Sequence, residues 1–223
     1  MKSIREGVVG PGDSLPSERE LEQMCGVSQI TVRRALSELA SEGYISRRPG
    51  LGTFVKKAKI VHPPGQPHGF LENLAAQGYD VAMKVIEFDK RLPPRRVASV
   101  LNIGLDIPIL YLRWLGYAEG EPLVLTTCYL NLGDEVTITR EEAAGGFIYR
   151  LLKAKYGITL HRIEKTIEAT GALEDEAQLL LVQPGAPMLL VIMLDVDDEG
   201  RLVSARRALY RGDRYKYREA FPP

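Results

Sequence analysis

The sequence predicts an α+β protein in two parts: a small helical N-terminal part and a larger part built on a mostly antiparallel sheet. Two helix-like segments precede two short strand-like segments within the first 57 residues. Residues 62–69 then hold three prolines and two glycines, which suit neither a helix nor a central strand. Beyond them, apolar strand-like segments are joined mostly by short, turn-rich connections, which favours antiparallel pairing.

The first 43 residues carry the signals of two consecutive helices. Ser17 and Glu20 have the spacing of a capping box, and Gly26 suits the left-handed end of the helix that follows. Ser28 is placed to cap a second helix that ends at Gly43. Apolar residues recur in it at helical spacing: Val32, Ala35, Leu36, Leu39 and Ala40. Strands over residues 44–48 and 53–57 then flank a glycine-rich tip. This order predicts a winged helix-turn-helix.

The remainder of the chain predicts a sheet with helices on one face. We expect helices over residues 70–77, 95–101, 141–156 and 174–181, and strands over residues 81–88, 109–117, 123–132, 158–169, 188–196 and 202–210. The predicted domains are residues 1–58 and residues 69–223, joined by a linker over residues 59–68.

Composition limits the functions that fit this chain. Its 223 residues are 45% hydrophobic, and no apolar run approaches the ~20 residues of a membrane helix. The N-terminus has no apolar signal core, so we expect a cytoplasmic protein with no membrane partner. Cys25 and Cys128 have no pairing pattern and are expected to be reduced, and the three histidines lack metal-ligand spacing. We therefore expect no metal and no cofactor.

The predicted second helix and the wing carry the side chains suited to reading DNA. The formal net charge is zero, so binding has to depend on where the bases lie. Gln29 can pair with adenine, Arg19 and Arg33 can reach guanine or phosphate, and Ser28 and Thr31 can meet phosphate at the helix start. The expected DNA-contacting residues are Arg19, Ser28, Gln29, Thr31, Arg33, Arg48, Gly50, Gly52 and Thr53.

Residues 8–57 resemble the winged helix-turn-helix of the GntR family of bacterial transcription regulators. The matching pieces are Pro11-Gly12-Asp13, Leu15-Pro16-Ser17-Glu18-Arg19, Val27-Ser28, Thr31-Val32-Arg33 and Gly52-Thr53-Phe54-Val55. The family usually has arginine in place of Gln29 and threonine in place of Ile30, so we expect an operator altered at the base that Gln29 reads. Its first helix is usually longer than residues 1–7 allow, which implies a short helix or a start site set late.

Residues 68–218 resemble the UTRA effector domain of the HutC-type branch, whose fold is similar to chorismate lyase. The matching pieces are Gly120-Glu121-Pro122, Ile148-Tyr149, Leu151-Leu152, Tyr156-Gly157-Ile158, Gly185-Ala186-Pro187-Met188-Leu189 and Tyr210-Arg211-Gly212-Asp213-Arg214-Tyr215. Members that sense phosphosugars carry arginines, glutamates and a serine at positions that here hold Trp114, Gly116, Thr126, Phe147 and Ser204. Phosphate needs charge-assisted donors, so the comparison predicts an uncharged or partly apolar effector that is not a sugar phosphate.

The pocket candidates in this second part are Arg113, Trp114, Thr126, Tyr149 and Ser204. Arg113 and Trp114 are neighbours on a strand, so only one of them can point inward. We expect the arginines at positions 206, 207, 211 and 214 to form a solvated strand face, and Asp213 to pair with Arg214.

Together these features predict a ligand-responsive repressor that binds a palindromic DNA operator as a homodimer and takes a small-molecule effector. The rival interpretation is an enzyme that uses the lyase-like fold, but the expected pocket positions hold no carboxylate, and fold alone is weak evidence for function. A third interpretation is a regulator whose pocket is vestigial.

Overall fold

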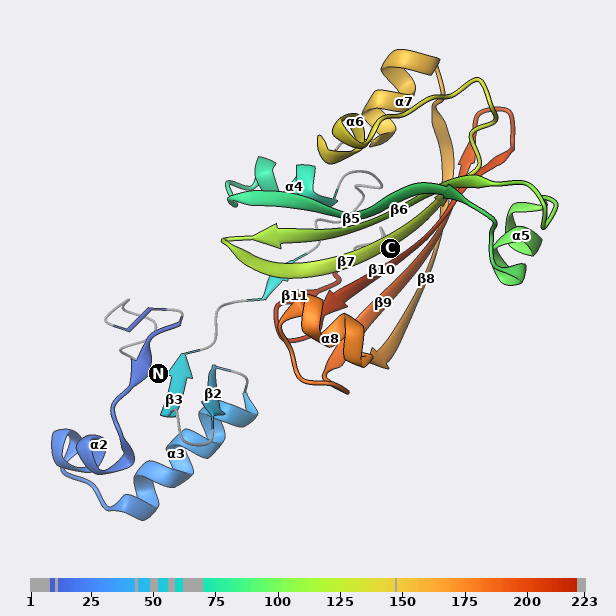
Figure 1. The fold of residues 1–223 in the computed structure, drawn as a ribbon. Helices are drawn as coiled ribbons and strands as arrows, with labels where there is room; N and C mark the ends of the chain where they lie inside the picture. Colours follow the sequence, from blue (N-terminus) through green and yellow to red (C-terminus); the bar gives the residue numbers. More distant parts are fainter. Residues whose placement is uncertain are drawn as a thin grey trace, which may run out of the picture. The chain divides into compact units, whose positions relative to one another are not determined.

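The computed structural model describes residues 9–10, 12–42, 44–48, 52–55, 59–61, 70–146 and 148–219 (Figure 1). The chain divides into two compact units, Met1–Lys59 and Ile60–Pro223. Within the described residues, no helix is both long and apolar enough to cross a bilayer.

The N-terminal unit is a helix pair beside a small antiparallel sheet. Its elements are β1 (Ser14–Leu15), α2 (Glu18–Cys25), α3 (Gln29–Ser41), β2 (Ile45–Arg48) and β3 (Gly52–Val55). The strands lie in the order β1-β3-β2. Val32, Leu36 and Ile45 form the buried centre, so the apolar face of α3 rests on β2. This is the predicted order of two helices followed by a hairpin.

The helix caps follow the local sequence. Ser17 and Glu20 form the predicted capping box, in which the Ser17 amide donates to Glu20 Oε2 at 2.7 Å and the Glu20 amide donates to Ser17 Oγ at 3.3 Å. Gly26 ends α2 with φ of 64°, and Ser28 caps α3, as predicted. The C-terminal cap of α3 is Glu42; Gly43, predicted to end this helix, lies outside the described residues.

The second unit is built on a six-stranded sheet that is antiparallel throughout. Its strands, in spatial order, are β5 (Val81–Arg91), β6 (Ile109–Ala118), β7 (Glu121–Leu130), β10 (Leu202–Arg211), β9 (Pro187–Asp197) and β8 (Leu160–Gly171). Glu119 and Gly120, with φ of 54° and 71°, make the tight turn between β6 and β7. The predicted α+β class with a largely antiparallel sheet is confirmed.

Helices cover both faces of this sheet, and the prediction of helices on one face was wrong. The helices are α4 (Phe70–Ala76), α5 (Arg95–Leu101), α6 (Arg140–Ala144), α7 (Ile148–Tyr156) and α8 (Glu174–Leu180). Leu74 of α4 packs in a cluster with Val124, whereas Leu180 of α8 packs in another with Leu125. Val124 and Leu125 are adjacent on β7 and face opposite ways, because side chains alternate along a strand.

One predicted helix and part of the predicted linker have a different structure. The helix expected over residues 141–156 is two helices, α6 and α7, because Gly145 and Gly146 interrupt it and Gly146 has φ of 81°. Ile60–Val61, predicted to lie in the linker, instead form β4, which pairs in parallel with β11 (Tyr215–Lys216). The Pro/Gly-rich stretch begins only after β4, so nothing prevents these two residues from pairing, and residues 62–69 lie outside the described part.

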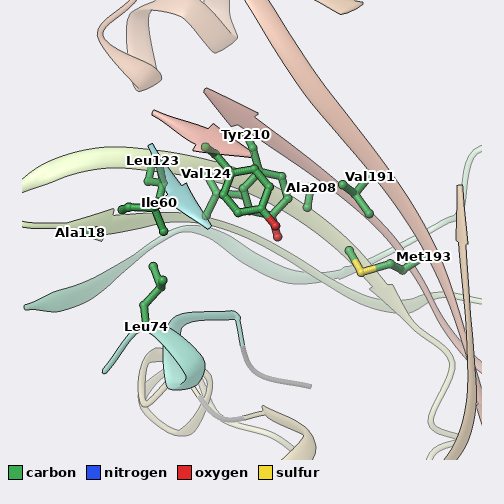
Figure 2. Close-up of a cluster of buried hydrophobic side chains, with 10 residues drawn as sticks. Ile60, Leu74, Ala118, Leu123, Val124, Val191, Met193, Ala208 and Tyr210 are labelled. Atoms are coloured by element: carbon green, nitrogen blue, oxygen red, sulfur yellow. The ribbon is translucent and has the colours of Figure 1, made fainter. Parts of the chain in front are cut away.

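The strand pair β4–β11 is anchored in the largest apolar cluster of the second unit. The Ile60 amide donates to the Arg214 carbonyl at 2.8 Å, and the Ile60 side chain is 1% exposed. Figure 2 shows Ile60 beside Ala118, Leu123 and Val124, with Leu74 of α4 opposite them. The first strand of the second unit is therefore part of its core.

Candidate nucleic-acid interface and ligand cavity

The start of α3 presents polar side chains to solvent. Ser28 Oγ accepts from the Thr31 amide at 3.4 Å and lies 2.9 Å from Thr31 Oγ1. Ser28, Gln29, Thr31 and Arg33 are all exposed, as is Arg19 on α2. Ile30 is 81% exposed, so an apolar side chain stands among these polar groups. The structure brings the predicted residues of α3 together on one end of the helix.

Glu18 links the start of α3 to the wing, which is the hairpin of β2 and β3. Its Oε2 accepts from Arg33 Nε at 2.7 Å, and its Oε1 lies 3.6 Å from Arg47 Nη2. The hydrogen bond to Glu18 raises the pKa of Arg33. This role of Glu18 is not apparent from the sequence, because its two partners lie 15 and 29 residues further along the chain.

The wing is described only in part. Gly52 has φ of 114°, a conformation that L side chains rarely adopt, and Thr53 pairs with Arg47 across the β2–β3 ladder. Gly50 and the side chain of Arg48, both predicted to contact DNA, lie outside the described part of the structure.

The second unit holds a cavity of about 330 Å³ against one face of the sheet. Trp114 on β6, Thr126 and Cys128 on β7 and Arg206 on β10 all line it. They share a face because Trp114 pairs with Thr126, and Arg206 pairs with Cys128. The wall opposite the sheet includes Phe70 of α4, Ile148 and Tyr149 of α7, and Tyr215 and Tyr217 near the C-terminus. Most of the lining is apolar or aromatic.

A buried polar network closes the base of the cavity. Asp195 on β9 is 0% exposed, and its carboxylate accepts from Arg206 Nε at 2.7 Å and Nη2 at 2.6 Å. The Tyr149 hydroxyl donates to Asp195 Oδ2 at 2.6 Å, and the Ser204 hydroxyl donates to the same oxygen. Tyr149 and Ser204 also lie 3.0 Å apart through their oxygens. The buried carboxylate is thus paired and hydrogen-bonded, as a buried charge must be.

The titratable groups that line the cavity have shifted pKa values. Burial raises the pKa of Tyr149 well above its usual value and that of Cys128 to about 12. Burial also lowers the pKa of Lys165, which lines the cavity from β8. For Arg206, burial acts to lower the pKa, but interactions with Tyr149 and Asp195 outweigh it and the pKa is raised. Tyr149 is therefore a neutral donor at neutral pH and Arg206 a permanent cation.

The structure groups four of the five predicted effector residues. Trp114, Thr126 and Tyr149 line the cavity, and Ser204 lies in the network beneath it. Arg113 does not belong there, and its assignment is corrected. It lies on the opposite face of the sheet, because it alternates with Trp114, and it pairs with Asp175 at 2.8 Å and Glu87 at 3.4 Å. Phe147 lies outside the described residues.

Three charged residues in or beneath the cavity were not predicted from the sequence: Lys165, Asp195 and Arg206. The expectation of a solvated face for the four arginines was wrong. Arg206 turns into the cavity, whereas Arg207 pairs with Glu176 at 2.7 Å and Arg214 with Glu121 at 3.2 Å. Asp213 pairs with Arg211 at 2.8 Å instead of with Arg214. Arg206 lies two residues after Ser204 on the same strand and so shares its face. The predicted inward position of Ser204 could therefore have indicated that Arg206 also points inward.

Charged side chains line part of the cavity. Arg206 is a cation within the lining, and Lys165 and Lys153 add two more. The expectation of an uncharged or partly apolar effector stays a prediction.

Comparison with known proteins places both units. The profile "UTRA domain" matches residues 76–216, and the profile "Bacterial regulatory proteins, gntR family" matches residues 1–55. The chain is 29% identical to the HTH-type transcriptional repressor NagR of Bacillus subtilis over 216 residues, covering 96% of this chain and 88% of NagR. It is 27% identical to the histidine utilization repressor of Pseudomonas aeruginosa, covering 99% and 87%.

A solved structure gives the same fold. The crystal structure of PhnF from Mycobacterium smegmatis superimposes with a TM-score of 0.68 at 28% identity, over 96% of this chain and 94% of PhnF. The profiles, the relatives and the structure agree with the helix-turn-helix and sheet described above. The chain belongs to the GntR family of bacterial regulatory proteins, as a HutC-type transcriptional repressor with a UTRA domain.

Proposed function

We propose that this repressor binds a palindromic operator as a homodimer and releases it when a small molecule fills the cavity. Support for the DNA part comes from the exposed start of α3, where Ser28, Gln29, Thr31 and Arg33 lie together. A helix-turn-helix reads one half-site, and a two-fold dimer reads two half-sites about one DNA turn apart.

The observation that carries the ligand response is the pairing of β4 with β11. Tyr215 of β11 lines the cavity, and Ile60 of β4 is its partner in the ladder. Lys59, the residue before Ile60, ends the DNA-binding unit. A ligand that moves Tyr215 therefore acts on the strand from which the DNA-binding unit extends. Such coupling requires that the ligand bind the two states of this strand pair with different affinities.

The effector we propose is small, partly apolar and not a sugar phosphate. Trp114 and Thr126 line the cavity at positions where phosphosugar-binding members carry charges, which supports this choice. A relative named for histidine utilization is consistent with an effector without phosphate. A vestigial pocket has less support, because the cavity is open to about 330 Å³ and retains an organised polar base.

The enzyme alternative has less support as well. Asp195 accepts hydrogen bonds from Arg206, Tyr149 and Ser204, which makes it an anchor for its neighbours instead of a free base. The relatives that the chain matches are transcriptional regulators.

The test is an unbiased selection of DNA by the purified full chain, followed by binding measurements at rising salt. We expect a palindromic site with adenine opposite Gln29 and a steep loss of affinity with salt, because phosphate contacts release counterions. A double variant, Gln29→Ala with Arg33→Ala, should lose the sequence preference while the melting temperature stays unchanged. Failure to enrich any sequence, with or without metabolite extract, would refute operator binding.

A further inference from the structure

We propose that the ligand of the cavity is a small organic carboxylate with an aromatic or apolar body, and that its carboxylate lies between Lys165 and Arg206. This inference rests on the proposed function of the cavity as the effector site. It adds the charge of the ligand and the two side chains that recognise it.

Lys165 and Arg206 lie on one row across the sheet. Lys165 of β8 pairs with Met193 of β9, and Met193 pairs with Arg206 of β10. Directly paired residues share a face, so both cationic side chains stand on the cavity face. Two strand spacings separate their backbones by roughly 10 Å. Side chains of this length can close on one small anionic group between them.

Arg206 is held in place with part of its guanidinium still available. Asp195 accepts from Nε and Nη2, which fixes the plane of the group, and the guanidinium carbon lies 4.8 Å from the ring centre of Tyr149. Within the described chain, no acceptor is hydrogen-bonded to Nη1. Since the side chain is 16% exposed and lines the cavity, Nη1 can donate to a ligand there. Charge-assisted donors of this kind suit a carboxylate.

Lys165 is a second cation of the cavity. Asp195 is paired with Arg206 and forms no ion pair with Lys165. Lys165 is half-buried, and no carboxylate among the described residues lies within ion-pair distance of its amine. Glu219 favours the charged form from further away and itself accepts from the Tyr217 hydroxyl at 2.6 Å. The Lys165 amine lies 5.7 Å from the ring centre of Tyr217, so its contact is with a π face and not with a carboxylate of the described chain. Burial of a cation without a counter-charge is unfavourable, and a bound anion would offset that cost.

The remaining charged side chains around the cavity leave its net charge positive. Glu72 is paired with Arg150 at 3.4 Å, and Lys153 is exposed at the edge of the lining. With Asp195 matched to Arg206, the excess near the base comes from Lys165 alone. Among the described residues, Lys153 remains as a second unmatched charge at the exposed edge, whereas Lys165 shares the row of Arg206, and this single unmatched cation beside Arg206 suits a monoanionic carboxylate.

Aromatic side chains form the rest of the site. Phe70 contacts Tyr210 edge-to-face at 4.9 Å between ring centres, and Tyr210 stacks on Tyr215 at 4.2 Å. Trp114 lines the cavity beside them. A cavity of about 330 Å³ is at the small end of ligand pockets, so a single ring or a short chain fits it.

The experiment uses the full chain and three probes that share a phenyl ring: phenylacetate, its neutral and nearly isosteric amide phenylacetamide, and phenyl phosphate. Trp114 is the single tryptophan of the chain, so its fluorescence reports binding in the cavity directly. We expect phenylacetate to bind about tenfold more tightly than the amide and more tightly than phenyl phosphate. Lys165→Gln should remove the preference over the amide. Lys84→Gln, which removes the same charge from the opposite face of the sheet, should keep it.

Equal or tighter binding of phenylacetamide would overturn the proposal, as would a preference that survives Lys165→Gln. Tighter binding of phenyl phosphate would assign the site to phosphate esters, and no binding by any probe would refute the aromatic carboxylate class. Operator binding by the same samples separates the two proposals. A chain that prefers the carboxylate but binds no operator refutes the repressor function alone, and a chain that binds operator without this preference refutes the ligand class alone.

Discussion

The carboxylate of Glu18 joins two arginines that come from different elements, with Oε2 at 2.7 Å from Arg33 Nε and Oε1 at 3.6 Å from Arg47 Nη2. Glu18 is the first residue of α2, Arg33 lies on α3 and Arg47 on β2. All three side chains have access to solvent, so salt screens these pairs and their contribution to stability is small. The pairs place two basic groups and one carboxylate side by side where α2, α3 and β2 meet.

Replacing Glu18 should change DNA selectivity more than stability. Glu18→Gln removes a negative charge beside Arg33 and Arg47, so we expect tighter binding to non-specific DNA and a smaller ratio of operator to non-specific affinity. Fluorescence anisotropy on operator and scrambled duplexes over a range of salt measures both quantities. Glu38→Gln, which frees only Arg34 further along α3, is the matched control. An unchanged ratio in Glu18→Gln would contradict the expectation.

The base read by Gln29 should follow its side chain. An amide can pair with adenine through two hydrogen bonds, whereas a guanidinium pairs in that way with guanine. Gln29→Arg should therefore move the preference at one position of each half-site from adenine to guanine, with a discrimination of about 1–3 kcal/mol. Binding to duplexes substituted at each half-site position gives the measurement. Guanine preference in the unaltered chain would rule out this reading of Gln29.

Removal of the charge on Asp195 should destabilise the second unit strongly. Asp195→Asn keeps the shape but leaves the buried guanidinium of Arg206 without its counter-charge, so we expect a loss of about 3–5 kcal/mol. Tyr149→Phe removes one hydrogen bond to the same carboxylate and should cost about 1.5–3 kcal/mol. Urea unfolding followed by Trp114 fluorescence measures both. Asp198→Asn, in the exposed turn after β9, should leave the free energy of unfolding unchanged. If Asp195→Asn and Asp198→Asn cost the same, the pair of Asp195 and Arg206 is not needed for stability.

The two cysteines should differ sharply in reactivity. Burial raises the pKa of Cys128 to about 12, so at pH 8 almost none of its thiol is the reactive thiolate, and reactivity should rise only as pH approaches 12. Cys25 is exposed. A thiol-specific reagent at pH 8 should thus modify one cysteine in the native chain and both after unfolding in guanidinium. Cys25→Ser should abolish the native reaction, and a fast reaction that persists in this variant would place Cys128 in contact with solvent.

The features predicted from the sequence are those set by short-range rules. The capping box of Ser17 and Glu20 spans three residues, and the end of α2 at Gly26 depends on the backbone freedom of one glycine. Alternation along β6 already implied that Arg113 and Trp114 face opposite ways. The break between α6 and α7 also has a local signal, the adjacent Gly145 and Gly146, which the prediction of one helix over residues 141–156 did not use.

The features that were missed depend on strand register or on distant pairing. Asp195 meets Arg206 because β9 and β10 pair in one register, with a shift between Leu202 and Ser204, and no local pattern fixes that shift. Ile60 meets Tyr215 across most of the length of the second unit. Glu18 finds Arg33 only after α2 and α3 have packed. None of these pairings was predicted, because each forms only when the tertiary structure brings its two partners together.

The alternation on the central sheet has a consequence for how such regulators diversify. One face carries Trp114, Thr126 and Arg206 toward the cavity, while the other carries Arg113 and Arg207 toward acidic residues of α8. On the proposal that the cavity takes the effector, we expect substitutions on the cavity face to change which molecule is bound and substitutions on the opposite face to change the stability of the fold. Related regulators can thus differ in the residues that face the ligand while they keep the residues that stabilise the other face of the sheet.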